Sequence, residues 1–120
     1  MNSILNSIKK LLGMEENYDH FDTDLIIHIN SILAVLAQMG VGRKGFTIKD
    51  ATETWDQFIV DEQDMETLKS YVYMRVRLLF DPPTTAHLVE SFNKMISEFE
   101  FRMFVEADPV LELPEIENDS

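Results

Sequence analysis

The stretch from Leu25 to Met39 constrains the fold of this chain more than any other feature, because its apolar residues recur at helical spacing. Asp22 or Thr23 offers a side-chain oxygen for the N-cap of a helix, and Gly40 ends the pattern as glycine does at helix C-termini. The apolar positions are Leu25, Ile26, Ile29, Ile32, Leu33, Leu36 and Met39. The sequence therefore predicts an amphipathic helix that begins near residue 22 and stops at Gly40.

Two further segments show the same spacing between clear breaks. Ser3 caps a short predicted helix that Gly13 ends. Asp64 caps a longer one that stops at residues 81–83, Asp-Pro-Pro, because proline disfavours the helical conformation in the residue before it. The apolar positions are Ile4, Leu5, Ile8, Leu11 and Leu12 in the first segment and Met65, Leu68, Val72, Val76 and Leu79 in the second.

A short segment between these long helices carries the chain's single tryptophan. Residues 52–58 predict a helical turn that inserts Trp55 and Phe58 into the core, and residues 46–48 read as one short extended stretch. A glycine-rich basic loop from Gly40 to Lys49 precedes the turn, but it lacks the glycine spacing and the Lys-Ser/Thr ending of a phosphate-binding loop.

The last predicted helix begins after Thr84 or Thr85, and prolines with a run of acidic residues end regular structure from Asp108. Its apolar positions are Leu88, Phe92, Met95, Ile96, Phe99 and Met103. The predicted fold class is all-α: a small four- to five-helix bundle over residues 1–107, followed by an extended acidic C-terminal tail over residues 108–120.

Acidic residues outnumber basic residues by 22 to 10, and the formal net charge is −12. This balance argues against a surface that binds nucleic acid, because such affinity comes largely from contacts of Lys and Arg with phosphates. It also argues against binding to an anionic membrane surface. Most acids fall in three blocks with the bases elsewhere in the sequence: Glu15–Asp24, Asp50–Glu66, and Glu106 to the end. Segregated charge gives a protein distinct electrostatic faces that set its choice of partner; plain solubility is the alternative.

The chain has no cysteine, which excludes disulfides, thiolate catalysis and cysteine-ligated zinc. Residues 19–24 are the densest cluster of potential metal ligands, but Phe21 interrupts the series and the central glycine of a calcium loop is missing. Helix capping explains these acids without a metal. With no catalytic triad, nucleotide motif or convergent carboxylate pair in view, the sequence predicts a protein that is not an enzyme and holds no metal or cofactor.

Three features point instead to binding. Arg43 and Lys44 place positive charge between two acidic blocks, where they suit an acidic patch on a neighbouring copy or partner. The two predicted helices that begin at Asp64 and after Thr84 or Thr85 carry more apolar surface than one helix face needs. On the second of them, Phe101 and Phe104 lie off the apolar stripe. Either a partner interface or a wide core explains this surplus. The tail alternates apolar residues, as an extended segment lying on another chain does; they are Val110, Leu111, Leu113 and Ile116. A frayed, solubilising end is the alternative.

Several stretches resemble the phage head–tail connector proteins, most closely those of phages and prophages of Gram-positive bacteria. They are residues 3–13 (SILNSIKKLLG), 21–25 (FDTDL), 29–33 (INSIL), 38–42 (QMGVG), 54–58 (TWDQF) and, most specific, 71–83 (YVYMRVRLLFDPP). The resemblance spans about residues 3 to 105 and leaves the tail outside. These motifs are structural and carry no catalytic site.

The resemblance implies a head-completion or adaptor protein that forms a ring, generally twelvefold, beneath the portal after DNA packaging. Its implied partners are copies of itself, the portal protein, and the next connector or tail component. DNA would pass through without specific binding, and the place of action would be the virion, after assembly in the host cytoplasm. Two alternatives stay open: an acidic DNA-mimic inhibitor, and a small adaptor that binds a host protein through its tail.

Overall fold

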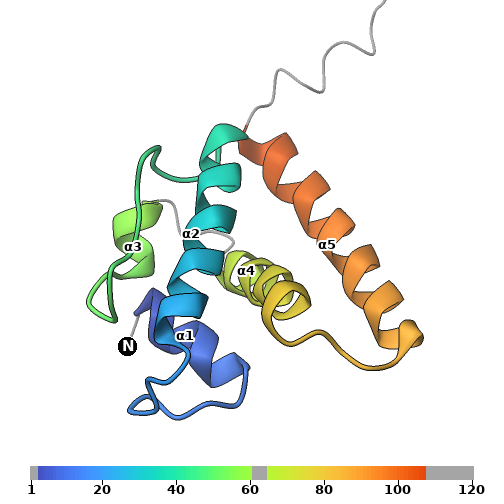
Figure 1. Cartoon of the computed structure of the whole chain (residues 1–120). Helices are drawn as coiled ribbons and strands as arrows, with labels where there is room; N and C mark the ends of the chain where they lie inside the picture. The colour runs from blue at the N-terminus through green and yellow to red at the C-terminus, as the bar shows by residue number, and fades with distance from the viewer. Residues whose placement is uncertain (1–2, 61–64, 108–120) are drawn as a thin grey trace, which may run out of the picture.

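The computed structural model of the chain describes residues 3–60 and 65–107, and over those residues it contains five helices and no strand (Figure 1). In chain order they are α1 (Ile4–Leu11), α2 (Asp22–Gln38), α3 (Trp55–Phe58), α4 (Met65–Phe80) and α5 (Ala86–Ala107). The predicted all-α fold is confirmed. The Asp64 cap and the tail over residues 108–120 lie outside the described residues, so the division into a helical domain and a tail stays a prediction.

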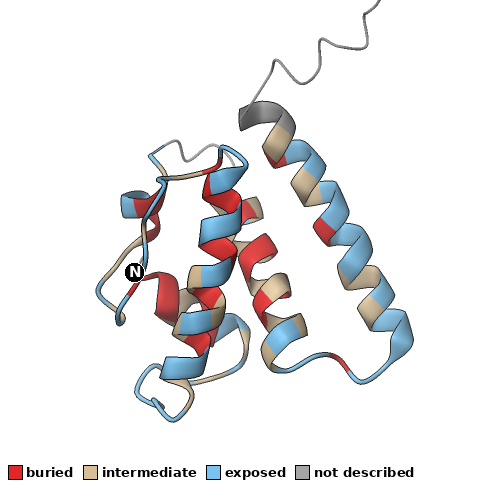
Figure 2. Ribbon diagram, turned by 45° about the horizontal axis from the view of Figure 1, so that its top comes forward, coloured by how far each residue is buried: buried red, intermediate tan, exposed pale blue. Residues whose placement is uncertain are grey.

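The helix α4 lies at the centre of the bundle, where it packs against α1, α2 and α5. Its buried residues are Leu68, Tyr71, Val72, Met74 and Val76, which point to more than one side of the helix. Burial on more than one side accounts for part of the apolar surplus predicted for this helix, while Leu79 near its end is exposed. By contrast, α5 packs mainly on α4, and most of its surface is exposed or half-buried (Figure 2).

Glycine ends α1 and α2 as predicted, through the same backbone motif. At the end of α2, Gly40 has a positive φ of 96°, and the N–H of Val41 donates to the Leu36 carbonyl at 2.8 Å while that of Gly40 donates to Ala37 at 3.1 Å. This is the Schellman pattern, which satisfies the carbonyls left free at a helix end. The predicted caps Ser3 and Thr85 are also confirmed, since their side-chain oxygens accept the N–H of Asn6 and Leu88 at 3.1 and 3.3 Å.

The predicted N-cap of α2 is wrong. Phe21 occupies the N-cap position with no side-chain hydrogen bond, and Asp22 is the first residue of the helix. The Asp22 carboxylate instead contacts the ammonium of Lys9, which is almost fully buried. A buried positive charge requires a charged partner more strongly than a helix end requires a cap, because desolvating an unpaired ion costs several kcal/mol.

The short helix α3 carries the predicted Trp55 and Phe58 into the core, where both side chains are essentially fully buried. Their segment is tied to the start of α1. The N–H of Ile4 donates to the Glu53 carbonyl at 3.0 Å, and the Trp55 indole donates to the Ser7 hydroxyl at 3.1 Å. The predicted burial of Trp55 and Phe58 is confirmed. The two hydrogen bonds connect α3 to α1, which lies far from it in the sequence.

Some residues assigned to apolar stripes are exposed in the structure: Leu11, Met39, Leu79, Leu88 and Met95. Each lies at the edge of its stripe or near a helix end, where the neighbouring helix no longer reaches.

Among the described residues, none of the helices combines the length and hydropathy needed to cross a membrane.

Candidate interaction surfaces

The basic loop, residues 40–49, is anchored to the core at several points. The side-chain amide of Asn30 donates to the Ile48 carbonyl at 3.0 Å and accepts the Ile48 N–H at 2.8 Å. The N–H of Arg43 donates to the Phe58 carbonyl at 2.8 Å, and the side chains of Val41 and Ile48 are buried. Residues 46–48, predicted as a short extended stretch, thus pair with a side chain rather than with a strand.

Gly42 brings this loop close to the ring of Phe58. Its φ is +89°, in the left-handed region that favours glycine, and a Cβ at this position would overlap the atoms of the buried Phe58 ring. Glycine is therefore required here for two reasons, backbone conformation and space. The loop therefore packs closely against α3 at Gly42.

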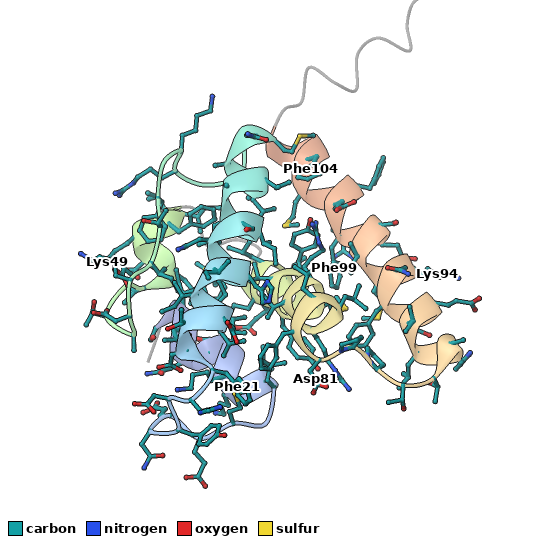
Figure 3. The ribbon with its side chains drawn as sticks, in the orientation of Figure 1. Phe21, Lys49, Asp81, Lys94, Phe99 and Phe104 are labelled. Carbon is teal, nitrogen blue, oxygen red and sulfur yellow. The ribbon has the colours of Figure 1, made fainter. Side chains whose placement is uncertain are left out.

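The anchored loop presents its basic residues to solvent. Arg43, Lys44 and Lys49 are all exposed, and Figure 3 shows Lys49 extending away from the bundle. The Arg43 guanidinium lies 6.0 Å from the ring centroid of Phe46, which holds the arginine stem against the loop. The sequence-predicted pair Arg43 and Lys44 therefore lies together on one exposed, rigidly supported surface.

The first acidic block is not free of positive charge in space. The Lys9 Nζ lies 2.9 Å from Asp22 Oδ1 and donates to the Glu16 carbonyl at 2.9 Å, with only 1% of its side chain exposed. The Lys9 ammonium and the Asp22 carboxylate form an ion pair, but their geometry does not meet that of a hydrogen bond. Lys9 thus fixes the loop between α1 and α2, and Asp22 contributes structure rather than surface charge.

The second acidic block also has a structural part. The Glu53 carboxylate accepts the N–H groups of Lys49 and Asp50 at 3.0 and 3.2 Å. The Asp50 carboxylate accepts hydrogen bonds from the side chain and the backbone of Thr52, and these lower the pKa of Asp50. These hydrogen bonds give both acids a structural role in the turn before α3, while the carboxylate of Asp50 stays exposed and ionised.

The helix α5 is held on α4 by a polar cluster between the two helices. The Tyr71 hydroxyl donates to Glu100 Oε2 at 2.8 Å and accepts from Arg75 Nη1 at 2.6 Å. Burial, and then the hydrogen bond to Glu100, raise the pKa of Tyr71 from 10.0 to about 12. A second contact between α4 and α5 is made by the Arg77 guanidinium, which lies over the Phe92 ring at 5.5 Å from its centroid.

The raised pKa of Tyr71 predicts a loss of stability at high pH. Tyr71 keeps its proton in the native state while the unfolded chain loses it, so its contribution is complete below pH 10 and is lost as pH rises through 12. A two-unit shift corresponds to about 3 kcal/mol, since one unit is worth about 1.4 kcal/mol. Urea unfolding at pH 9 and pH 11 should show a smaller decrease for Tyr71→Phe than for the natural chain, and equal decreases would contradict this.

The outward side of α5 carries a large exposed aromatic residue. Phe101 is 72% exposed and lines a shallow hollow together with Ser97, Glu98 and Arg102. Phe104 is half-buried and packs on the core, so the structure separates the two predicted interface aromatics. Figure 3 shows Phe99 and Phe104 on the bundle side of α5 and Lys94 on the opposite side. The tail residues of the same prediction, Val110, Leu111, Leu113 and Ile116, lie outside the described residues.

The outward face of α2 is a further exposed surface, which the sequence reasoning missed. Ile27 is 58% exposed, Met39 47% and Val35 40%. A signal for this face exists in the sequence: no Asp, Glu, Lys or Arg occurs between Asp24 and Arg43. A long helix with an exposed side but no charged residue after its first turn is unusual in a chain that is 27% charged.

Within residues 3–60 and 65–107, no group of three or more histidine or acidic side chains is placed to hold a metal ion. The surfaces described above are suited to contacts with other macromolecules.

A family model described as phage connector protein matches residues 4–110. No curated protein and no solved structure matches the chain.

Proposed function

The chain belongs to the phage connector protein family, and we propose that it forms a ring beneath the portal, extends the DNA exit channel and provides the docking surface for the next connector or tail component. Family membership itself implies assembly with phage head and tail proteins, a place in the virion and a structural rather than enzymatic role. The match over residues 4–110 is the observation that carries the proposal. As its origin we propose a phage or prophage of Gram-positive bacteria.

Two described surfaces support assembly into a closed ring. In a ring each copy presents one surface to its neighbour on one side and a different surface on the other. The exposed basic pair Arg43 and Lys44 and the exposed Phe101 on α5 come from different elements of the fold. In our proposal each copy's basic loop meets acidic residues of the next copy. Phe101 lies in the same interface, and twelve copies close the ring.

The negative charge has a role in the same proposal. DNA leaves the head through the channel and must not adhere to it. A surface rich in Lys and Arg would hold DNA by releasing counterions, whereas an acidic surface repels phosphates. With a net charge of −12, a ring of these chains lined by carboxylates would let DNA slide past. A ring with its bases in the lumen and its acids outside would contradict this part.

The C-terminal tail, residues 108–120, is proposed to lie on the portal as an extended segment. Its apolar residues alternate with acids and prolines, a pattern suited to a groove or strand edge of another chain. Deleting the tail should weaken binding to purified portal about tenfold or more and leave thermal unfolding of the helical bundle unchanged. Co-sedimentation with portal measures the first and circular dichroism the second. Equal portal binding by the full and shortened chains would remove the tail from the docking surface.

A further inference from the structure

The outward face of α2 has the residue spacing of a helix that packs on another helix. Ile27, Ser31, Ala34 and Gln38 are all exposed and follow one another at intervals of four, three and four residues. That spacing sets the four side chains in one row along the helix, which we call the seam, because residues three and four apart are neighbours on a helix surface. In the view of Figure 1, α2 runs along the front of the bundle, while α1 and α4 lie behind it.

The two ends of this face carry opposite charge. Asp19 and Asp24, both exposed, lie at the N-terminal end of α2. Arg43 and Lys44, also exposed, follow its C-terminal end on the anchored basic loop. Exposed acids therefore flank the N-terminal end of α2 and exposed bases its C-terminal end, with no charged residue between Asp24 and Arg43.

We propose that the outward face of α2 binds the same face of a second copy of this chain, with the two helices antiparallel. An antiparallel arrangement places the acidic end of each copy against the basic end of the other, so both charge contacts form twice. A parallel arrangement would set like charges together at both ends, which is unfavourable. The charge pattern of one copy is thus complementary to itself only in this orientation.

The two-fold axis of this pair passes between Ser31 and Ala34. These are the smallest side chains of the seam, and small residues allow two helix backbones to approach closely. Ile27 of each copy then lies near Gln38 of the other, and Asp24 lies near the turn at Gly40 that ends the partner copy's α2 and leads into its basic loop. Because the seam covers a single helix, the pair is weaker than a standard interface.

This pair goes beyond the proposed ring and differs from it in symmetry. An isologous contact closes after two copies, whereas a ring needs contacts that continue from copy to copy. In the pair, Arg43 and Lys44 contact acids of the second copy and are not available for the ring contact. The two copies would therefore separate, and the basic loop become available, only when binding to the portal is more favourable than the pair. The two proposals fail separately, because one is tested without portal and the other with it.

The absence of cysteine from the chain permits a direct test. In the full-length protein, Ser31→Cys would place one thiol beside the two-fold axis, within the roughly 4.4–6.8 Å Cα separation that a disulfide accepts. Ser97→Cys, at an exposed position on the outward side of α5, is the matched control. Without portal and under mild oxidation, we expect Ser31→Cys to form covalent dimer at least about tenfold faster than Ser97→Cys. Equal rates, or a faster control, would overturn the proposal.

A charge exchange tests the orientation. Ser31→Cys combined with Asp24→Lys, and Ser31→Cys combined with Lys44→Glu, should each form covalent dimer several-fold more slowly than Ser31→Cys alone. Mixed together, the two variants should recover the rate as a heterodimer, which its mass identifies, because each then meets opposite charge at both ends. A mixture as slow as its components would contradict the antiparallel pair.

Discussion

Replacing Gly42 with alanine should lower the free energy of unfolding by about 3 kcal/mol. Holding a residue with a Cβ in the left-handed region costs about 1–2 kcal/mol, and forcing atoms into a packed core adds about 1–3 kcal/mol. Both costs arise here, since the φ of Gly42 is +89° and the new Cβ would overlap the buried Phe58 ring. Urea unfolding followed by the fluorescence of Trp55, the single tryptophan, measures the change.

Gly45→Ala is the matched control for this prediction. Gly45 lies in the same loop with a φ of +80°, but no atom of the surroundings lies within 4 Å of the position its Cβ would take. Only the conformational cost of about 1 kcal/mol remains. If the two variants lost the same stability, the close approach of Gly42 to Phe58 would not be what fixes the basic loop.

The second large effect is expected for Asp22→Ala, which removes the charged partner of Lys9. The Lys9 ammonium is 1% exposed and would keep only the Glu16 carbonyl. Leaving a buried charge without its counter-ion costs about 3–5 kcal/mol. Because Asp22 itself is partly exposed and water can replace part of its role, we expect the lower end of that range from urea unfolding.

Two further variants separate charge from general damage. Glu15→Ala removes an exposed acid from the loop between α1 and α2 and should change the free energy of unfolding by less than about 0.5 kcal/mol. Adding Lys9→Met to Asp22→Ala replaces the buried ammonium with an apolar side chain of similar length and should recover most of the loss. A double variant no more stable than Asp22→Ala would show that the ion pair is not the cause.

The helices were predictable because local rules and tertiary packing agree along most of this chain. Helical spacing, Ser3 at a helix start and Gly40 at a helix end all indicate the same boundaries that the structure has. Sequence reasoning failed at Asp22, where an acid next to a helix start reads as a cap. Its true partner, Lys9, becomes a neighbour only when α1 and α2 fold together.

Exposure was harder to predict than secondary structure. Leu79 and Met95 occupy apolar positions at helical spacing just as the buried Val72 and Val76 do, yet Leu79 and Met95 face solvent. Which side of a helix is covered depends on its neighbours, and periodicity alone does not identify them. The basic pair Arg43 and Lys44 was found because a glycine-rich loop favours exposure. The exposed face of α2 was not predicted because its signal in the sequence is the lack of charged residues between Asp24 and Arg43, not a row of apolar ones.

The central claim is that copies of this chain close into a ring on the portal, and the mass of the complex formed by purified chain and portal tests it most directly. We expect one complex in which a full ring, twelve copies, binds each portal assembly, with no intermediate copy numbers in excess. Portal and chain that remain separate, or single copies that bind without completing a ring, would contradict the account.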